Sequence, residues 1–386
     1  MAFMTDIVRQ EIATTATTMV VKVGTRVLTK ANGVLDLERI DLLAQDLHWV
    51  MATGRKVVLV SSGAVGAGVG RLGLRGRPTN LAQLQAVAAA GQSLLVEAYQ
   101  RSLQKYGRHV GQVLLTAEDL DHRQRYLNAR NTILALLEYG VLPIINENDT
   151  ISVAELQTTF GDNDRLAAIV TNLIRAPLLV LLSDVEGLYD SDPSLPDAKV
   201  VSTVENLGPE ILALVRDAKT GLGKGGMASK LEAARQATCS GENVIIASGR
   251  RPGILREILE GRQVGTAFLA RGQEIAARKR WIGYTVQPRG RLLVDAGAQR
   301  AVQQKGGSLL AIGVVKVSGN FVKGDVVAVC DAEGQEFARG LSNYGCDDIR
   351  RIRGLKTAEI PGVLGHCPYE EVVHRDNLLV TRTNTG

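Results

Sequence analysis

The sequence has little cysteine and few aromatic residues, and each scarcity excludes a class of protein. Phe, Trp and Tyr make up only 4% of the 386 residues, which argues against an aromatic-rich β-sandwich. The four cysteines are far apart and never at CxxC spacing: they are Cys239, Cys330, Cys346 and Cys367. This pattern predicts the reduced thiols of a cytosolic protein, with neither a disulfide framework nor a zinc site.

Long apolar runs and a concentrated positive charge are also absent. The most apolar stretch, residues 176–182, is far too short to span a bilayer. Residues 1–13 carry Asp6 and Glu11 and have no apolar segment of the kind that a signal peptide needs. We therefore expect a cytoplasmic protein with no membrane partner. Residues 1–270 hold 28 basic and 28 acidic side chains, and residues 289–375 have a net charge of only +2, which argues against nucleic acid as a partner.

What the sequence does contain is a regular alternation of two patterns. Short runs rich in Val, Ile and Leu predict strands that are buried on both faces of a parallel sheet; they lie at residues 19–23, 56–60, 110–115, 141–145, 178–182 and 244–246. Stretches with helical spacing separate them, at residues 36–53, 81–106 and 123–139. The alternation predicts an α/β fold, with an open, mostly parallel sheet sandwiched by helices.

The pattern changes near residue 271. Beyond a charged segment, shorter alternating runs are separated by Gly and polar turns, which predicts a small β-rich domain; they lie at residues 291–294, 309–317, 325–330 and 335–340. A chain of 386 residues is long enough for a large domain and a smaller one. We expect an α/β domain at residues 17–270, a charged linker at 271–288 and the β-rich domain at 289–375.

The residues that follow the strands are candidates for a site, because ligands of open α/β sheets bind beyond the carboxyl ends of the strands. Lys22 stands just before Gly24, where a lysine can reach a phosphate while the backbone passes close by. Ser62 and Gly63 open a run of small residues whose N–H groups can converge on an anion. A surface lysine before a turn and close strand–helix packing are the alternative interpretations.

One stretch matches the glycine pattern of a dinucleotide-binding motif but lacks its other features. Gly68, Gly70 and Gly73 fit G-x-G-x-x-G, but they start late after the strand. No Asp or Glu follows until Glu97, so the acid that binds the ribose of a nicotinamide dinucleotide is missing. This weakens a dehydrogenase as an interpretation.

Polar and acidic side chains follow two further segments. The run 146–150 includes Asp149, and the run 160–164 includes Asp162, Asn163 and Asp164 directly before a helical stretch. An Asx-rich turn and a helix N-cap account for some of these residues. The number of acids favours contact with a substrate, for example with its ammonium group. After the next strand, Ser183-Asp184 suits a nucleotide or its Mg²⁺, with a capped turn as the alternative.

The richest segment is the glycine and lysine run at residues 220–230. Glycines, two cations and the start of a helix together are typical of phosphate binding, and the residues concerned are Lys224, Gly225, Gly226, Met227, Ala228, Ser229 and Lys230. The run does not fit a Walker A loop. None of the five histidines stands in a triad or an HExxH pattern. Phosphoryl transfer to a carboxylate would need no general base, only in-line placement and positive charge.

Taken in order, these segments resemble the amino-acid kinase family over nearly the whole chain. The matching pieces are VVKVGT, SSGAVGAG, INENDT, FGDNDRLAA, LLSDVEGLY and GLGKGGMASK, and VKVSGNFVKGD resembles a C-terminal PUA domain. The resemblance is strongest to the branch that phosphorylates glutamate on its γ-carboxylate in the first step of proline synthesis. It implies an ATP-dependent kinase that uses Mg²⁺ bound to ATP and has no metal site of its own.

The resemblance also assigns roles to residues. It implies that Lys22 and Lys230 neutralise the transferring phosphoryl group and that Asp164 orients them. It implies that glutamate is bound by Ser62, Gly63, Asp149 and Asn163, with Asp162 in support. ATP would contact Lys22, Ser183, Asp184 and the loop from Lys224 to Lys230. Departures from the family pattern are Arg26, where a small hydroxyl residue is common, and Lys224 and Ala228, where Thr and Ser are common.

Further partners follow from the resemblance alone. It implies inhibition by proline, a homodimer or homotetramer, and a γ-glutamyl phosphate reductase as a partner for the unstable product. Two alternatives stay open at this point. A sister acyl-phosphate kinase would share the ATP half and differ around residues 149–164. An RNA-binding protein would use the C-terminal domain, although its low charge and few aromatic residues argue against this.

Overall fold

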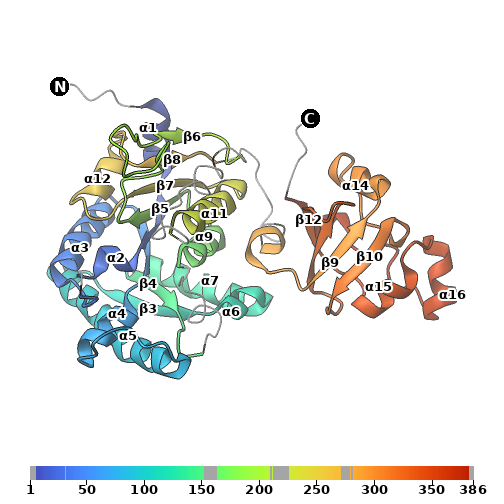
Figure 1. Ribbon diagram of the computed structural model, residues 1–386, viewed down its shortest axis with the longest axis horizontal. Helices are drawn as coiled ribbons and strands as arrows, with labels where there is room; N and C mark the ends of the chain where they lie inside the picture. Colours follow the sequence, from blue (N-terminus) through green and yellow to red (C-terminus); the bar gives the residue numbers. More distant parts are fainter. Residues whose placement is uncertain are drawn as a thin grey trace. The chain divides into compact units, whose positions relative to one another are not determined.

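The computed structural model describes residues 6–30, 32–151, 163–208, 226–270 and 281–381, together with Ile211 and Lys279. The chain divides into two compact units, Met1–Gln273 and Glu274–Gly386, and each unit has its own sheet (Figure 1). None of the helices in the described ranges combines the length and the apolar character that a membrane span requires.

The first unit is built on an eight-stranded sheet with the order β3-β4-β2-β1-β5-β7-β8-β6. All neighbouring strands from β3 to β7 run parallel, and only the β7–β8 pair is antiparallel. The strands are β1 (Thr18–Val23), β2 (Lys56–Ser61), β3 (Val110–Leu115), β4 (Leu142–Glu147), β5 (Leu178–Ser183), β6 (Thr203–Val204), β7 (Asn243–Ser248) and β8 (Thr266–Phe268). Because β1, β2, β4 and β5 run parallel, their carboxyl ends lie at the same edge of the sheet.

Helices cover both faces of this sheet (Figure 1). One layer contains α1 (Ile7–Thr15), α3 (Leu37–Ala52), α4 (Ala64–Arg71), α5 (Leu81–Gln104) and α12 (Ile254–Leu259). The other contains α6 (Ala117–Asp121), α7 (Arg123–Glu138), α9 (Asn163–Ile174) and α11 (Gly226–Cys239), and α9 contacts β1, β2, β4 and β5. The short α2 (Thr25–Leu28) follows β1. The predicted fold, an open and mostly parallel sheet between helices, is confirmed.

One expectation about this unit was wrong. The strand β3 is only partly buried, because it lies at the edge of the sheet and pairs with β4 alone. The polar segment before β1 forms the helix α1, whose N-terminus is capped by the Asp6 side chain accepting from the N–H of Val8. Its buried Arg9 donates to the carbonyl oxygens of Val264 and Ser202, both at 2.6 Å, which satisfies a charge that would otherwise be costly inside a protein.

The glycines of the rejected dinucleotide motif have a packing role in the structure. A Cβ on Gly68 of α4 would lie 1.9 Å from the carbonyl oxygen of Val87 on α5. A Cβ on Gly91 of α5 would lie 1.9 Å from the carbonyl oxygen of Ala64 on α4. The two helices therefore approach so closely that only glycine fits at these positions. This contact fixes α4, whose first residues border the site described below.

The second unit has a five-stranded sheet with the order β10-β9-β11-β12-β13, in which only the β9–β11 pair is parallel. Its strands are β9 (Gly290–Val294), β10 (Val314–Gly319), β11 (Val326–Cys330), β12 (Glu336–Leu341) and β13 (Leu378–Val380). The predicted β-rich character is confirmed, but the sequence pattern did not indicate three helices, α14 (Ala296–Gln303), α15 (Cys346–Ile352) and α16 (Ile360–Leu364). A buried π-helical turn, Trp281–Thr285, precedes β9.

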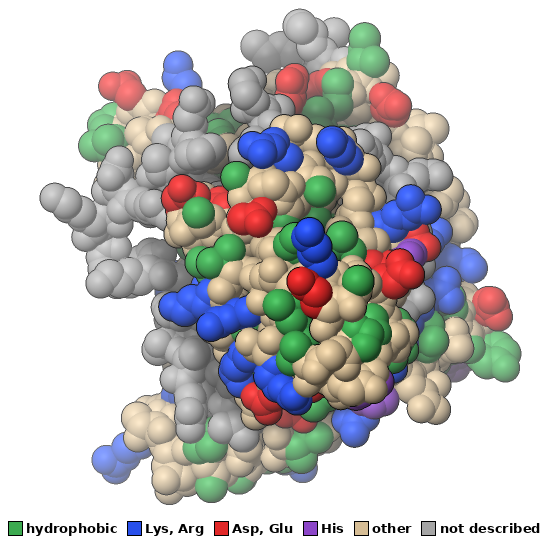
Figure 2. All heavy atoms as spheres, turned by 90° about the vertical axis from the view of Figure 1, so that its right-hand side faces the viewer, with side chains coloured by type: hydrophobic (Ala, Val, Ile, Leu, Met, Phe, Trp, Pro, Cys, Tyr) green, Lys and Arg blue, Asp and Glu red, His purple; other side chains and the backbone are tan. Residues whose placement is uncertain are grey.

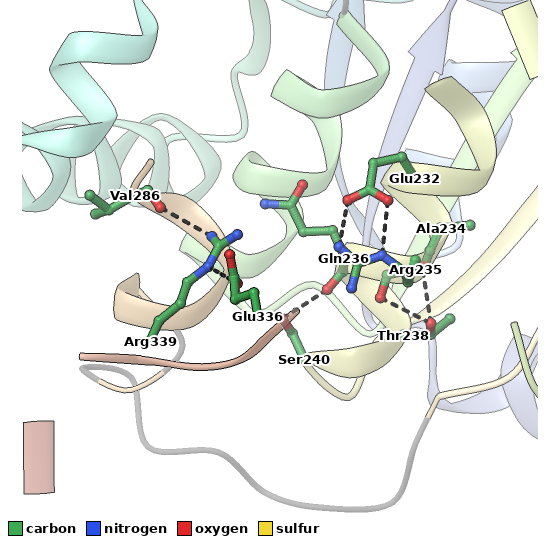
Figure 3. A network of polar contacts seen from close by, with 9 residues as sticks. All are labelled: Glu232, Ala234, Arg235, Gln236, Thr238, Ser240, Val286, Glu336 and Arg339. Atoms are coloured by element: carbon green, nitrogen blue, oxygen red, sulfur yellow. Dashed lines mark hydrogen bonds and ion pairs between the residues drawn. The ribbon is translucent and has the colours of Figure 1, made fainter. Parts of the chain in front are cut away.

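Several polar and aromatic side chains of the second unit take part in its own fold. In Figure 3, Arg339 of β12 reaches the Glu336 carboxylate at 2.6 Å and the Val286 carbonyl oxygen at 3.3 Å. The rings of Phe321, Phe337 and Tyr344 are buried and so are not available to stack on bases. On the face of this unit in Figure 2, Lys and Arg side chains are interspersed with acidic and apolar ones.

Candidate active site

A cleft of about 490 Å³ lies at the carboxyl ends of β1, β2, β4 and β5. Its volume is in the range of small-molecule sites. Most of the residues that the sequence predicted for a site line this one cleft: Lys22, Ser62, Gly63, Asp149, Asn163, Asp164, Ser183, Asp184, Gly226, Ser229 and Lys230. Residues that are 208 positions apart in the chain, Lys22 and Lys230, thus meet because their elements end at the same edge of the sheet.

A buried carboxylate between two buried ammonium groups forms the centre of the cleft. Asp164 lies in the first turn of α9. Its Oδ1 forms an ion pair with Lys22 of β1, and its Oδ2 forms one with Lys230 of α11 at 3.1 Å. The three residues are 3%, 5% and 8% exposed respectively. Lys230 also donates to the Gly226 carbonyl oxygen at 3.0 Å, and Ser229 donates to Asp164 at 2.7 Å. Lys22 and Lys230 are thus both paired with Asp164, which Ser229 also contacts.

The electrostatics of this cluster keep Asp164 ionised. Burial, the largest single influence, would raise the pKa of this carboxyl group, but the charges of Lys22 and Lys230 oppose it. Together with hydrogen bonds from Lys22 and Ser229, they hold the pKa of Asp164 below its usual value. Two ammonium groups and one carboxylate leave a net charge of +1, so the cluster attracts an anion that enters the cleft.

Three helices begin at the same cleft. The first residues of α4, α9 and α11 all line it. Gly63, the N-cap of α4, has φ +112°, a left-handed conformation that favours glycine, and it turns the chain directly from β2 into the helix. The N-terminal ends of helices carry free N–H groups and a partial positive charge. They add to the attraction of the two lysines for phosphate or carboxylate groups.

On α11 itself, side-chain pairs support the helix that carries Lys230. Arg235 and Glu232 form a two-point contact, with N–O distances of 2.9 and 2.6 Å (Figure 3). Thr238 and Ser240 return their hydroxyl groups to carbonyl oxygens one turn earlier in the chain. These contacts lie on the C-terminal side of Lys230, whereas the first residues of the helix line the cleft.

One wall of the cleft is a network of amide side chains. Asn163 of α9 donates through Nδ2 to the Ser62 hydroxyl at 2.8 Å and to Oδ1 of Asn146 at 3.0 Å. Asn146 and Glu147 are the last residues of β4, so they belong to the strand and not to the loop after it. Asn163 Oδ1 is buried and has no hydrogen-bond partner within the described ranges. It is therefore a buried acceptor beside the cleft that the described part of the chain leaves unsatisfied.

Asp149 follows β4 on the same wall. Burial and the nearby Glu147 raise the pKa of Asp149 to about 6, although Arg77 opposes the shift. Arg77 lines the cleft as well. A carboxylate with this pKa is ionised at neutral pH but poorly solvated, so it gains from pairing with a cationic group.

Ser183 and Asp184 lie at the end of β5. The Ser183 hydroxyl donates to Asp184 at 3.2 Å, and Arg26 of α2 pairs with Asp184 at 3.3 Å. Burial would raise the pKa of Asp184, but its backbone hydrogen bond and Arg26 lower it below the usual value. Arg26 is largely exposed at the mouth of the cleft. Arg26, one of the three residues that depart from the family pattern, is thus in contact with a predicted nucleotide-binding residue.

Five predicted residues are not placed at the cleft. Asp162, Lys224 and Gly225 lie outside the described residues. Met227 and Ala228 are on α11 but do not line the cleft. Conversely, Arg77 lines the cleft without having been predicted, because it stands in a polar loop with no pattern to single it out. Asn146 was seen as polar, but only the structure shows that its amide contacts Asn163.

Comparison with known proteins agrees with this geometry. The amino acid kinase family matches residues 17–248, and the PUA domain matches residues 290–364. A glutamate 5-kinase from Rhodopirellula baltica is 48% identical over 97% of this chain and 96% of its own length. Glutamate 5-kinases from Myxococcus xanthus and Syntrophotalea carbinolica are 50% and 47% identical over 94% and 97% of this chain, and over 96% and 100% of their own lengths. The chain therefore belongs to the amino acid kinase family and, within it, to the glutamate 5-kinases, as a kinase with a C-terminal PUA domain.

Proposed function

We propose that this kinase transfers the γ-phosphoryl group of ATP to the γ-carboxylate of L-glutamate and so forms L-glutamyl 5-phosphate. The observation that carries the proposal is the buried Lys22–Asp164–Lys230 cluster at the meeting point of three helix N-termini. Such a site compensates the charge of two anions that must approach each other. The similarity to glutamate 5-kinases supports glutamate as the acceptor.

The reaction needs charge compensation more than proton transfer. A carboxylate oxygen of glutamate attacks Pγ, a new P–O bond forms, the bond from Pγ to the bridging oxygen breaks, and ADP leaves with those electrons. The acceptor is already an anion, so no base has to remove a proton. Lys22 and Lys230 offset the negative charge on the transferring group, and Asp164 keeps the two lysines apart and aimed at it.

The amide wall suits the amino-acid end of the substrate. We assign Asp149 and the oxygen of Asn163 to the α-ammonium group, and Ser62 and the α4 N-terminus at Gly63 to a carboxylate. The resemblance to the family adds Asp162 in support of this half of the site.

The other end of the cleft suits the nucleotide. We assign Ser183, Asp184 and the run from Lys224 to Lys230 to ATP, the last by family resemblance. Mg²⁺ fits the site as an ion carried by the ATP phosphates, because the Asp164 carboxylate is engaged by lysines and Asp184 by Arg26. When bound, it would neutralise phosphate charge. Within the described ranges, no three His, Cys, Asp or Glu side chains are grouped so as to hold a metal ion.

We further propose that the product enters proline synthesis and that proline inhibits the enzyme. The proposal includes a homodimer or homotetramer, a cytoplasmic location and delivery of the acyl phosphate to a reductase. These points rest on the family resemblance of the sequence motifs.

The experiment that tests the function is ATP turnover with Mg²⁺ on a panel of acceptors. The panel contains glutamate, aspartate, N-acetylglutamate, carbamate and UMP, and hydroxylamine traps any acyl phosphate as a hydroxamate. Of the five acceptors, we expect only glutamate to give a hydroxamate, and we expect less hydroxamate when proline is added. Turnover with another acceptor would support the assignment of a kinase site but contradict glutamate as the substrate. Turnover with none of the acceptors would contradict the whole proposal.

The raised pKa of Asp149 predicts a pH dependence of glutamate binding. Only the ionised carboxylate attracts the ammonium group, and it protonates as the pH falls through about 6. The γ-carboxyl group of glutamate titrates lower, near about 4.3. We therefore expect kcat/KM for glutamate to be constant above pH 7 and to approach a tenfold fall per pH unit below about 6.

Asp149→Asn provides the control. This variant should lose the pH dependence between pH 5 and 7 and have a KM for glutamate raised by about tenfold or more, since a charged hydrogen bond contributes roughly 1.5–3 kcal/mol. A parent enzyme whose kcat/KM stays flat down to pH 5.5 would refute the role of Asp149.

A further inference from the structure

A chain of hydrogen bonds runs from helix α5 to the wall of the cleft. Gln92 of α5 accepts through Oε1 from Asn146 Nδ2 at 2.8 Å. Asn146 Oδ1 accepts from Asn163 Nδ2 at 3.0 Å, and Asn163 Nδ2 also donates to Ser62 at 2.8 Å. All four side chains are buried. Ser62, Asn146 and Asn163 line the cleft, whereas Gln92 does not, so within the described residues Gln92 is linked to the cleft through Asn146.

The direction of every bond in this chain is set by one backbone group. The N–H of Glu147 donates to Asn146 Oδ1 at 2.9 Å, and a backbone N–H can only donate. The atom of Asn146 that it meets must therefore be the oxygen, so the NH₂ group of Asn146 faces Gln92. The group of Asn163 that meets the same oxygen must be its NH₂ group, because two acceptors would repel each other.

This direction decides what the wall offers to a ligand. Both hydrogens of Asn163 Nδ2 are used, one by Ser62 and one by Asn146. Asn163 Oδ1 is left as a buried acceptor without a partner in the described part of the chain. Ser62 receives a hydrogen bond, so its own O–H proton is directed elsewhere. The hydrogen bonds thus leave an unused acceptor at Asn163 and the hydroxyl proton of Ser62, the pair that an ammonium group and a neighbouring carboxylate require.

We propose that Gln92 is a positioning residue that keeps this acceptor–donor pair in place and so makes the site specific for a free α-amino acid. The proposal rests on the function proposed above. Gln92 holds the NH₂ end of Asn146 while Glu147 holds the oxygen end. Without Gln92, the NH₂ group of Asn146 would be buried with no acceptor, and the opposite orientation of the amide would become less unfavourable. In that orientation Asn163 turns its oxygen inward and an N–H outward, against the substrate ammonium group.

The test compares two substitutions of Gln92 with a matched control on the same helix. Gln92→Met removes the amide at similar volume, Gln92→Glu keeps an oxygen acceptor for Asn146, and Gln83→Met makes the same change at an exposed position of α5. The probes are glutamate and glutarate, which lacks the α-ammonium group and is measured as a competitive inhibitor. Thermal unfolding checks that each variant is folded.

For Gln92→Met we expect the KM for glutamate to rise about tenfold, as one unsatisfied buried donor can cause. The Ki of glutarate, kcat and the KM for ATP should stay within about threefold, so the preference for glutamate over glutarate falls about tenfold. Gln92→Glu and Gln83→Met should both behave like the parent. This change in preference separates a positioning role from a merely structural one, which would weaken both ligands alike.

Equal changes for glutamate and glutarate in Gln92→Met, or no change for either, would overturn the proposal. If Gln92→Met does not fold, Gln92→Glu becomes the test of the proposal. A roughly tenfold rise in its KM for glutamate, at a normal unfolding temperature, would then contradict the proposal. Activity of the parent enzyme tests the proposed function separately from the role of Gln92. A parent that does not phosphorylate glutamate refutes the proposed function, whereas an active parent with an unmoved preference refutes only the role of Gln92.

Discussion

Lys230→Ala is expected to reduce turnover by about 10²- to 10³-fold, the loss seen when one preorganised charge-stabilising group is removed from an active site. The KM for glutamate should change far less, because the lysine interacts most strongly with the charge that develops in the transition state. Lys230 is buried and held at 3.1 Å from Asp164 and at 3.0 Å from the Gly226 carbonyl oxygen. A neighbouring side chain or water therefore cannot easily take its place.

The measurement is the rate of hydroxamate formation at saturating ATP and glutamate. Lys199→Ala is the matched control, since Lys199 is an exposed lysine of the same unit that does not line the cleft, and it should behave like the parent. Lys230→Arg keeps the charge with a different shape and should retain more activity than Lys230→Ala. Turnover of Lys230→Ala within threefold of the parent would exclude Lys230 from the transition state.

Much of this site was predictable from the sequence because parallel topology converts sequence order into position. Each buried strand of the sheet ends where polar residues begin, and the carboxyl ends of parallel strands lie at one edge. Lys22, Ser62 and Ser183 could therefore be grouped by their places at the ends of predicted strands. The segment around Lys230 was grouped with them by its glycines and by family resemblance.

What the sequence could not predict depends on contacts between distant side chains. Nothing near Gln92 on α5 marks it as a partner of Asn146, which is 54 residues further along the chain. Arg9 looks like a solvated residue of a polar segment, yet its guanidinium is buried against carbonyl oxygens 255 and 256 residues away. The partial burial of β3 depends on its place at the edge of the sheet, which its apolar composition does not reveal. Local patterns predict elements, but pairing across the sheet decides the surroundings of each side chain.

Asp164→Asn is expected to have the largest effect on stability. The substitution leaves Lys22 and Lys230 buried close together without a counter-charge, and removing one partner from a buried ion pair costs about 3–5 kcal/mol. We expect the midpoint of thermal unfolding to fall by about 10 °C, given roughly 2–4 °C per kcal/mol for a domain of this size. Turnover should fall as well, because the lysines lose the group that fixes their positions.

The pH dependence of this loss distinguishes a charge effect from a packing effect. The pKa of Asp164 is lowered in the folded protein, so its stabilising charge is fully present above the unfolded pKa of about 3.9 and is lost as the pH falls through the folded pKa. The difference in unfolding temperature between parent and Asp164→Asn should therefore be constant between pH 8 and 5 and shrink below about 4. Asp197→Asn, an exposed carboxylate of the same unit, should leave the unfolding temperature unchanged. If Asp164→Asn unfolds at the same temperature as that control, the two lysines do not depend on Asp164, and the arrangement proposed for phosphoryl transfer would have to be abandoned.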